Sequence, residues 1–262
     1  MFDRPDPATA AALARLYDLD LETDPGDLDL YLALAGRADG PVLELGAGTG
    51  RLAVPLAAAG HPVTAVDIDP AMIERGRARA AVAGIADGRL EWITADLLDL
   101  RLPDAGRYAL AFIALNSIML LASRDAQRTA LRTLAANLAP GGLAAVDVWL
   151  PDADDLARFD GRVILEWPRS EPEFGHIVTK TGSAIHDAAT NTITLTAIYE
   201  EGAQGGAVQR WLRRDQLRLV SADELAGFAE DAGLTVELIA GGYDLGPIGP
   251  GSERAVLVAV RP

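Results

Sequence analysis

The chain has 262 residues, half of them hydrophobic, and a formal net charge of -15 at pH 7. This acidity argues against nucleic acid or an anionic membrane surface as a partner, because both require a basic footprint. With no cysteine and three histidines, the chain lacks disulfides, thiolate metal sites and cysteine nucleophiles, and we expect a mechanism without a metal.

The length and composition fit one large α/β domain, or one domain with an insertion. No apolar run approaches the roughly 20 residues of a membrane span, and residues 1–7 lack the basic-then-apolar order of a signal peptide. We therefore expect a cytoplasmic protein, as a monomer or a homodimer.

The first predicted strand, Val42–Leu45, breaks directly into alternating glycines at Gly46, Gly48 and Gly50. Glycine permits backbone angles and close approaches that a Cβ would block. Helical apolar spacing resumes over Leu52–Ala59. A strand, a glycine turn and a helix in this order predict that a nucleotide-like cofactor lies on the turn.

The spacing of the glycines narrows the choice of cofactor. A dinucleotide loop reads G-x-G-x-x-G, but after Gly46 and Gly48 the third required position holds Arg51. A loop of the form G-x-x-x-x-G-K-[ST] does not occur, and the single lysine, Lys180, is far from the glycine turn, which argues against a nucleoside triphosphate site.

The second predicted strand, Pro62–Val66, ends at Asp67, 21 residues after Gly46, close to the spacing that brings two strand ends together in a βαβ unit. A carboxylate at this position can accept hydrogen bonds from both ribose hydroxyls. Asp67 could instead cap the next helix, but Asp69 lies directly before Pro70 and suits the cap better. We therefore favour ligand contact for Asp67.

Polar residues also follow the third and fourth predicted strands. Leu90–Ala95 ends at Asp96, and Tyr108–Leu115 ends at Asn116. In an open α/β sheet, ligands bind at the carboxyl ends of the strands. Four successive strand ends that carry a polar residue therefore predict one binding edge.

The second half of the chain changes pattern. Residues 125–138 predict a helix and residues 143–149 a fifth strand, after which an antiparallel β insertion is expected. Its strands are predicted over Arg162–Trp167, Ile177–His186, Asn191–Glu200 and Ala207–Leu219, followed by a helix over Ala222–Ala232 and closing strands over Leu234–Ala240 and Arg254–Val260.

The pattern E-x-G-x-G-x-G from Glu44 to Gly50 resembles the first motif of class I S-adenosylmethionine-dependent methyltransferases, as does the Leu-x-Pro-Gly-Gly turn over 138–142. The resemblance implies an α/β, Rossmann-like three-layer sandwich with a seven-stranded, mostly parallel sheet and a terminal antiparallel hairpin. It implies S-adenosyl-L-methionine as cofactor and S-adenosyl-L-homocysteine as its product. The cofactor contacts that it implies are Tyr17, Tyr31, Glu44, Gly46, Ala47, Gly48, Gly50, Asp67, Ile68, Met72, Asp96, Leu97 and Asn116.

From about Tyr17 onward, the order of elements resembles small-molecule methyltransferases, among them sugar-amine N-methyltransferases, in which a β insertion covers the acceptor. This likeness implies a single methyltransferase domain over 1–262. Its expected parts are an N-terminal helical lid over 1–40, core segments over 41–151 and 221–262, and an antiparallel insertion over 152–220.

The acceptor is expected to contact one apolar residue after the fourth strand and several aromatic residues. The alternative for the aromatics is that they pack the insertion onto the main sheet. Acidic residues of the insertion are further candidates, for holding a basic acceptor, although acids at strand ends are usually solvated. The acceptor candidates are Leu120, Trp149, Trp167 and Tyr199, and the acids are Glu166, Glu200 and Glu201.

A general base is not assigned by the resemblance. Many of these relatives carry a histidine after the fourth strand, where this chain has Leu120. His176 and His186, at the two ends of a predicted strand in the insertion, are the catalytic candidates. The alternative is that both are ordinary polar residues at strand ends.

These observations favour transfer of a methyl group to a small-molecule acceptor, a natural product or secondary metabolite, by in-line displacement aided by alignment and exclusion of water. Nitrogen is favoured over oxygen or carbon, because an unprotonated amine needs no base. One alternative is a cyclase or isomerase of the same fold that binds the cofactor without methylating. The other is a NAD-dependent oxidoreductase, which Arg51 and the absence of a Tyr-x-x-x-Lys pair disfavour.

Overall fold

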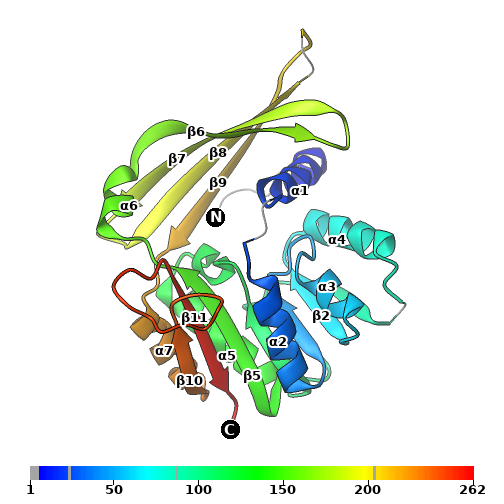
Figure 1. Ribbon diagram of the computed structural model, residues 1–262, viewed down its shortest axis with the longest axis vertical. Coiled ribbons are helices and arrows are strands. Elements are labelled where there is room, and N and C mark those ends of the chain that lie inside the picture. The colour runs from blue at the N-terminus through cyan, green and yellow to red at the C-terminus, as the bar shows by residue number, and fades with distance from the viewer. Residues whose placement is uncertain (1–5, 23–24, 87, 203–204) are drawn as a thin grey trace. The chain divides into compact units, whose positions relative to one another are not determined.

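The computed structural model describes residues 6–22, 25–86, 88–202 and 205–262. The chain divides into two compact units (Figure 1). The core unit comprises residues 25–150 and 220–262, and the insertion unit comprises residues 1–24 and 151–219. The expected insertion, 152–220, differs from the observed segment by one residue at each end.

The core unit is built on a seven-stranded sheet with the order β10-β11-β5-β4-β1-β2-β3. Strands β1 to β5 run parallel to one another, and β11 pairs antiparallel with both β5 and β10. This is the mostly parallel sheet with a terminal antiparallel hairpin that the sequence predicts. The strands are β1 (Val42–Leu45), β2 (Val63–Asp67), β3 (Leu90–Thr94), β4 (Tyr108–Ile113), β5 (Leu138–Trp149), β10 (Thr235–Ala240) and β11 (Arg254–Val260).

Helices cover both faces of this sheet. Phe112 of β4 packs against Tyr31 of α2, with ring centroids 4.4 Å apart, whereas its neighbours Ala111 and Ile113 are buried toward the other face. The helices of the core unit are α2 (Leu28–Ala38), α3 (Ala53–Ala58), α4 (Pro70–Val82), the 3-10 turn η1 (Ser117–Leu120), α5 (Arg124–Asn137) and α7 (Ala222–Asp231). Among the residues that the structure describes, no helix is long and apolar enough to cross a membrane.

Strand β5 begins five residues earlier than the sequence predicts. The turn of Pro140, Gly141 and Gly142 was expected to precede the strand, but Leu138 already pairs with Tyr108 of β4. The glycines form an irregularity within the strand, where the register shifts. A Cβ on Gly142 would lie 2.9 Å from the carbonyl oxygen of Tyr108, so a glycine is needed for the two strands to approach.

The insertion unit contains a four-stranded antiparallel sheet with the order β6-β7-β8-β9. The first strand is longer than predicted because register shifts allow pairing to continue past Trp167. The elements of this unit are α1 (Pro7–Asp20), α6 (Ala153–Arg158), β6 (Asp160–Glu171), β7 (His176–Asp187), β8 (Thr192–Gly202) and β9 (Gln209–Arg218).

The two N-terminal helices belong to different units, and the expected helical lid over 1–40 stays a prediction. Helix α1 packs on the four-stranded sheet, where Leu16 and Leu19 form an apolar cluster with Val178 and Tyr199. Helix α2 belongs to the core unit, because its buried face packs on the central sheet. The amphipathic pattern of each helix indicates a buried face but does not identify the sheet that buries it.

Candidate cofactor site at the carboxyl ends of the strands

The glycine turn after β1 adopts backbone that favours glycine. Gly46, Gly48 and Gly50 all have positive φ, at 79°, 54° and 76°. Gly50 has a second role, because a Cβ there would lie 2.5 Å from Cη2 of Trp92. A Cβ on Gly46 would lie 3.3 Å from Cβ of Ser117, so the glycine turn lies directly beside the turn after β4.

Asp67, at the end of β2, is bound to this turn. One carboxylate oxygen accepts from the amide of Gly48 at 2.7 Å, and the other accepts from the amide of Asp69 at 2.9 Å. Burial raises the pKa of Asp67, and these amide hydrogen bonds oppose the rise. Because each carboxylate oxygen has two lone pairs, Asp67 can still accept from a ligand hydroxyl. Asp69, as predicted, caps α4 by accepting from the amide of Ala71 at 2.9 Å.

Glu44 is a buried carboxylate beneath the same turn. Its pKa is raised to about 8, mainly by burial, while the nearby positive charge of Arg51 opposes the rise. Within the described residues, its Oε2 atom is buried and has no hydrogen-bond partner. A buried acid of this kind can meet a cationic group of a ligand.

Arg51, the residue that breaks the dinucleotide pattern, has its own partner. It donates to both carboxylate oxygens of Asp27, which is fully buried directly before α2. Asp27 was not among the predicted site residues. Its signal in the sequence is weak, because one acid within an acidic segment resembles a solvated residue.

The turn after β4 is held in left-handed backbone. Leu115 and Asn116 have φ of 49° and 64°, a conformation that costs roughly 1–3 kcal/mol for a residue other than glycine. The side-chain oxygen of Asn116 accepts from the amide of Trp149 at 2.5 Å. Leu120, predicted to contact the acceptor, lies in η1 and is 46% exposed.

A second buried carboxylate, Asp147 of β5, lies below that turn and was missed. It accepts from the amide of Leu115 and from the hydroxyl of Tyr31, both at 2.8 Å. It also accepts from the Tyr243 hydroxyl at 3.1 Å and from Arg254 at 2.8 Å. Its only signal in the sequence is an acid within the apolar run Leu143–Trp149.

Tyr31, predicted to contact the cofactor, is fully buried. Its hydroxyl donates a hydrogen bond to Asp147. The structure places it below the strand ends as a support. Tyr17 lies in the other unit, on α1, and is partly buried.

The remaining predicted cofactor contacts lie near the ends of β2 and β3. Ile68 is 47% exposed, and Met72 lies in the first turn of α4. The amide of Ala95 donates to the carbonyl of Asp67 at 2.9 Å, which brings Asp96 and Leu97 to the same edge. Asp96 also accepts from the amide of Leu98 at 2.9 Å.

The predicted acceptor residues of the insertion are packed under α1. The Trp167 indole donates to Asp20 at 2.9 Å, and the buried Tyr199 donates to the same carboxylate at 3.3 Å. Both belong to the apolar cluster on which α1 lies. Within the insertion unit both side chains therefore pack against α1, and their contact with the acceptor stays a prediction.

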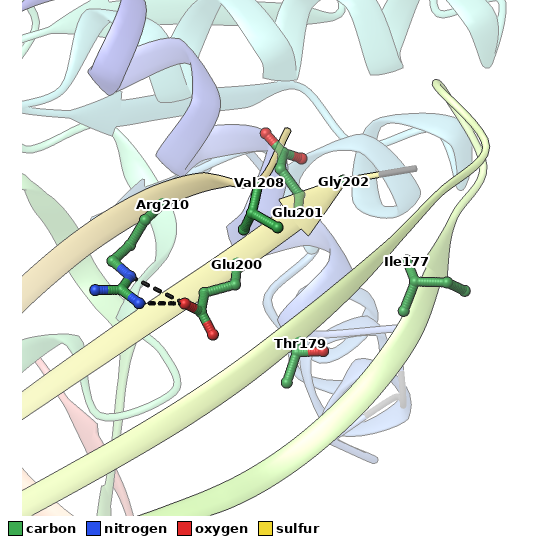
Figure 2. A pocket seen from close by; sticks show the side chains of 7 residues that line it. All are labelled: Ile177, Thr179, Glu200, Glu201, Gly202, Val208 and Arg210. Carbon is green, nitrogen blue, oxygen red and sulfur yellow. Dashed lines mark hydrogen bonds and ion pairs between the residues drawn. The ribbon is translucent and has the colours of Figure 1, made fainter. Parts of the chain in front are cut away.

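The three candidate acids of the insertion each have a cationic partner. Glu166 pairs with Lys180, Glu200 with Arg210, and Glu201 with Arg15. Glu200 and Arg210 line a pocket of about 560 Å³. Figure 2 shows the ion pair between them. Other residues that line the pocket are Ile177, Thr179, Glu201, Gly202 and Val208. The strand register places Thr179, Glu200 and Arg210 opposite the α1 side of the sheet.

The two candidate histidines are far apart. His176 and His186 lie at the ends of β7, ten residues apart on the same face, so about 33 Å separates them. His176 lies near Phe174, with ring centroids 6.1 Å apart. Nε2 of His186 is buried and, within the described chain, has no hydrogen-bond partner. At most one of them can serve a given reacting atom.

An open sheet of this order, with a glycine turn after β1 and polar groups at the carboxyl ends of its middle strands, defines the class I methyltransferase fold. The comparisons with known proteins agree. Residues 42–142 match the family model described as a methyltransferase domain.

Among curated proteins, the uncharacterized methyltransferase Rv0089 of Mycobacterium tuberculosis is 40% identical over 105 residues, which are 40% of this chain and 48% of that protein. The chain thus matches about half the length of the curated relatives. Among solved structures, the CcbJ methyltransferase of Streptomyces caelestis is 26% identical, with a TM-score of 0.76 and 98% of each chain covered.

SAM-bound CalS10 from Micromonospora echinaspora, an amino pentose methyltransferase, has a TM-score of 0.67 at 18% identity, with 100% of both chains covered. At this identity the likeness concerns the fold. Together with the matched domain, the findings confirm the predicted fold class and identify residues 42–142 as similar to a methyltransferase domain.

Proposed function

We propose that the protein transfers a methyl group from S-adenosylmethionine to the nitrogen of a small-molecule acceptor from natural-product metabolism. The observation that carries the proposal is the charge of the site. Asp67 is bound to the glycine turn, Asp96 lies at the same edge, and the one basic side chain of the turn, Arg51, is committed to Asp27. Such a site suits a cationic cofactor better than the pyrophosphate of NAD.

The residues fit this cofactor in kind. Asp67 retains lone pairs for the ribose hydroxyls, Asp96 lies at the neighbouring strand end, and Glu44 has a buried oxygen without a partner in the described chain. When bound, S-adenosylmethionine supplies a methyl group on a sulfonium sulfur. The chain contributes by holding and orienting the reactants and by excluding water, effects that can reach about 7–11 kcal/mol in well-oriented systems.

Nitrogen is proposed as the acceptor atom because an unprotonated amine needs no general base for the displacement, and Leu120 stands where many relatives carry a histidine. The names of two structural neighbours support this choice. KedS8 is a sugar N-methyltransferase and MtfA a glycopeptide N-methyltransferase. We further propose that the insertion unit selects the acceptor.

Calorimetry tests the cofactor. We expect S-adenosylmethionine and S-adenosylhomocysteine to bind at micromolar concentration and NAD to show no binding. Binding of NAD, with indifference to both sulfur compounds, would overturn the proposal. Transfer of radiolabelled methyl to a panel of amino sugars, and to the matching sugars with a hydroxyl in place of the amine, then tests the acceptor class.

The two histidines test the role of a base. In a base-independent reaction, neither His176→Ala nor His186→Ala should approach the roughly 10²–10⁴-fold loss of turnover typical when a general base is removed. A loss of that size, at unchanged cofactor affinity, would indicate a hydroxyl or ammonium acceptor. Label that never leaves the cofactor would favour the cyclase or isomerase alternative.

A further inference from the structure

Asp147 connects four separate parts of the core unit. Its Oδ1 atom accepts from the Tyr31 hydroxyl of α2 and from the amide of Leu115 after β4. Its Oδ2 atom accepts from Tyr243, before β11, and from Arg254, the first residue of β11. The side chain is fully buried, so these four donors replace the water that the carboxylate loses on folding.

The backbone that Asp147 holds is strained. Leu115 and Asn116 both adopt left-handed φ, which residues other than glycine keep only where their surroundings force it. The end of β5 provides that force at two points. Asp147 accepts from the amide of Leu115, and the amide of Trp149 donates to the side chain of Asn116.

The strained turn lies against the glycine turn. Ser117, the next residue, lies so close to Gly46 that a Cβ on the glycine would approach it to 3.3 Å. A shift of the turn after β4 would therefore displace Gly46. The position of the Asp147 carboxylate therefore affects the glycine turn, where the proposed cofactor lies. The side chain itself points below the strand ends toward α2.

We propose that Asp147 is a positioning residue of the cofactor site, which holds Leu115 and Asn116 in left-handed backbone before the cofactor binds. The inference rests on the proposed function, since it requires a cofactor at these strand ends. It assigns a role in binding to a residue that touches the site only through the backbone of the turn after β4.

Two substitutions of Asp147 distinguish a role in positioning the turn after β4 from a general contribution to the stability of the fold. Both Asp147→Ala and Asp147→Asn remove the charge that pairs with Arg254, but asparagine keeps an oxygen that can accept from the amide of Leu115. We expect S-adenosylhomocysteine affinity, measured by calorimetry, to fall at least about tenfold in Asp147→Ala and to stay within about threefold in Asp147→Asn, since one hydrogen bond is worth about a factor of ten.

Tyr108→Phe is the control, because it removes a buried hydrogen bond to Thr64 at the opposite end of β4. It should lower the melting temperature and leave S-adenosylhomocysteine affinity unchanged. The inference is overturned if folded Asp147→Ala binds like the wild type, or if Asp147→Asn loses as much affinity as Asp147→Ala. A wild-type protein that binds no S-adenosylhomocysteine contradicts the proposed function instead.

Should Asp147→Ala not fold, amide hydrogen exchange in the wild type tests the same claim. The amide of Leu115 should be protected before S-adenosylhomocysteine is added and should change little afterwards. An amide that exchanges like a loop residue and becomes protected only on binding would show that the cofactor, and not Asp147, orders the turn.

Discussion

Arg51 donates to both carboxylate oxygens of Asp27, at 2.5 and 2.6 Å, and so ties the glycine turn to the start of α2. Asp27 is fully buried and the Arg51 side chain is 18% exposed, so water screens this pair little. Loss of one partner would leave the other charge buried without compensation.

Arg51→Ala is therefore expected to lower the free energy of unfolding by about 3–5 kcal/mol in urea denaturation. Arg37→Ala is the control, because the Arg37–Glu237 pair is on the surface and should be worth less than about 1 kcal/mol. The double variant Asp27→Leu, Arg51→Leu should recover part of the loss. Equal effects of Arg51→Ala and Arg37→Ala would contradict this account.

Two aspartates, two residues apart, are expected to have separable effects. Asp67→Ala should weaken S-adenosylhomocysteine binding by about 1.5–3 kcal/mol, as for hydrogen bonds to a charged group. Asp69→Ala removes the cap of α4 and should lower stability by about 1 kcal/mol with little change in affinity. Calorimetry and urea denaturation on both variants measure the two effects, and an equal loss of affinity would mean that Asp67 acts only through the fold.

Asp96→Ala is expected to weaken binding less than Asp67→Ala does. The proposed contact of Asp96 is one hydrogen bond to the adenine amino group, whereas Asp67 can meet two ribose hydroxyls. The same calorimetric titration measures both. A larger effect at Asp96 would indicate that the adenine contact dominates.

Glu44 should make the free energy of unfolding depend on pH. Its pKa of about 8 in the folded protein lies above the ordinary value of 4.5, so the folded state keeps a proton that the unfolded state loses. Stability should therefore fall as pH rises from about 4.5 to about 8, by at most about 1.4 kcal/mol per pH unit, and level off above.

Glu44→Gln keeps a neutral side chain of similar shape and should abolish this part of the pH dependence. Its free energy of unfolding relative to the wild type should rise steadily between pH 5 and pH 8, as measured by urea denaturation at each pH. A constant difference across that range would show that Glu44 is ionised in the folded protein.

Gly76 and Gly36, both within helices, should respond in opposite directions to alanine. Alanine usually favours a helix over glycine by about 1 kcal/mol, and at Gly36 a Cβ would meet no atom within 4 Å. At Gly76 a Cβ would lie 2.3 Å from Cη2 of Trp92, so overpacking should cost about 1–3 kcal/mol. Thermal denaturation of the two alanine variants measures these effects. Stabilisation by alanine at both positions would mean that the Trp92 side chain can move away from Gly76.

Local patterns predicted much of the core unit. The glycine turn, the polar strand ends and the Asp69 cap each depend on residues close together in the chain, so spacing alone indicates them. The residues that hold the site in place from below cannot be predicted from such local patterns. Tyr31 and Arg254 reach Asp147 from 116 and 107 residues away, and no short pattern encodes that meeting.

The insertion shows a second limit. Alternation along residues 162–219 predicts strands, but it does not indicate which face of the sheet α1 covers. From the sequence, Trp167 and Tyr199 could therefore either line a pocket or pack against another element. Both side chains donate a hydrogen bond to Asp20 of α1, which is 147 residues away from Trp167 in the sequence. The buried pair of Arg15 and Glu201, 2.6 Å apart, likewise joins two distant segments.

Lys180 makes the docking of α1 open to chemical footprinting. It is the single lysine of the chain, and its ammonium lies 2.6 Å from Asp20 of α1 and 2.8 Å from Glu166. An acylating reagent therefore has one lysine to modify, and that side chain is 12% exposed while α1 is seated. The rate at which mass spectrometry finds Lys180 acylated would report how often α1 leaves its sheet, without any introduced label, and Asp20→Ala should increase it.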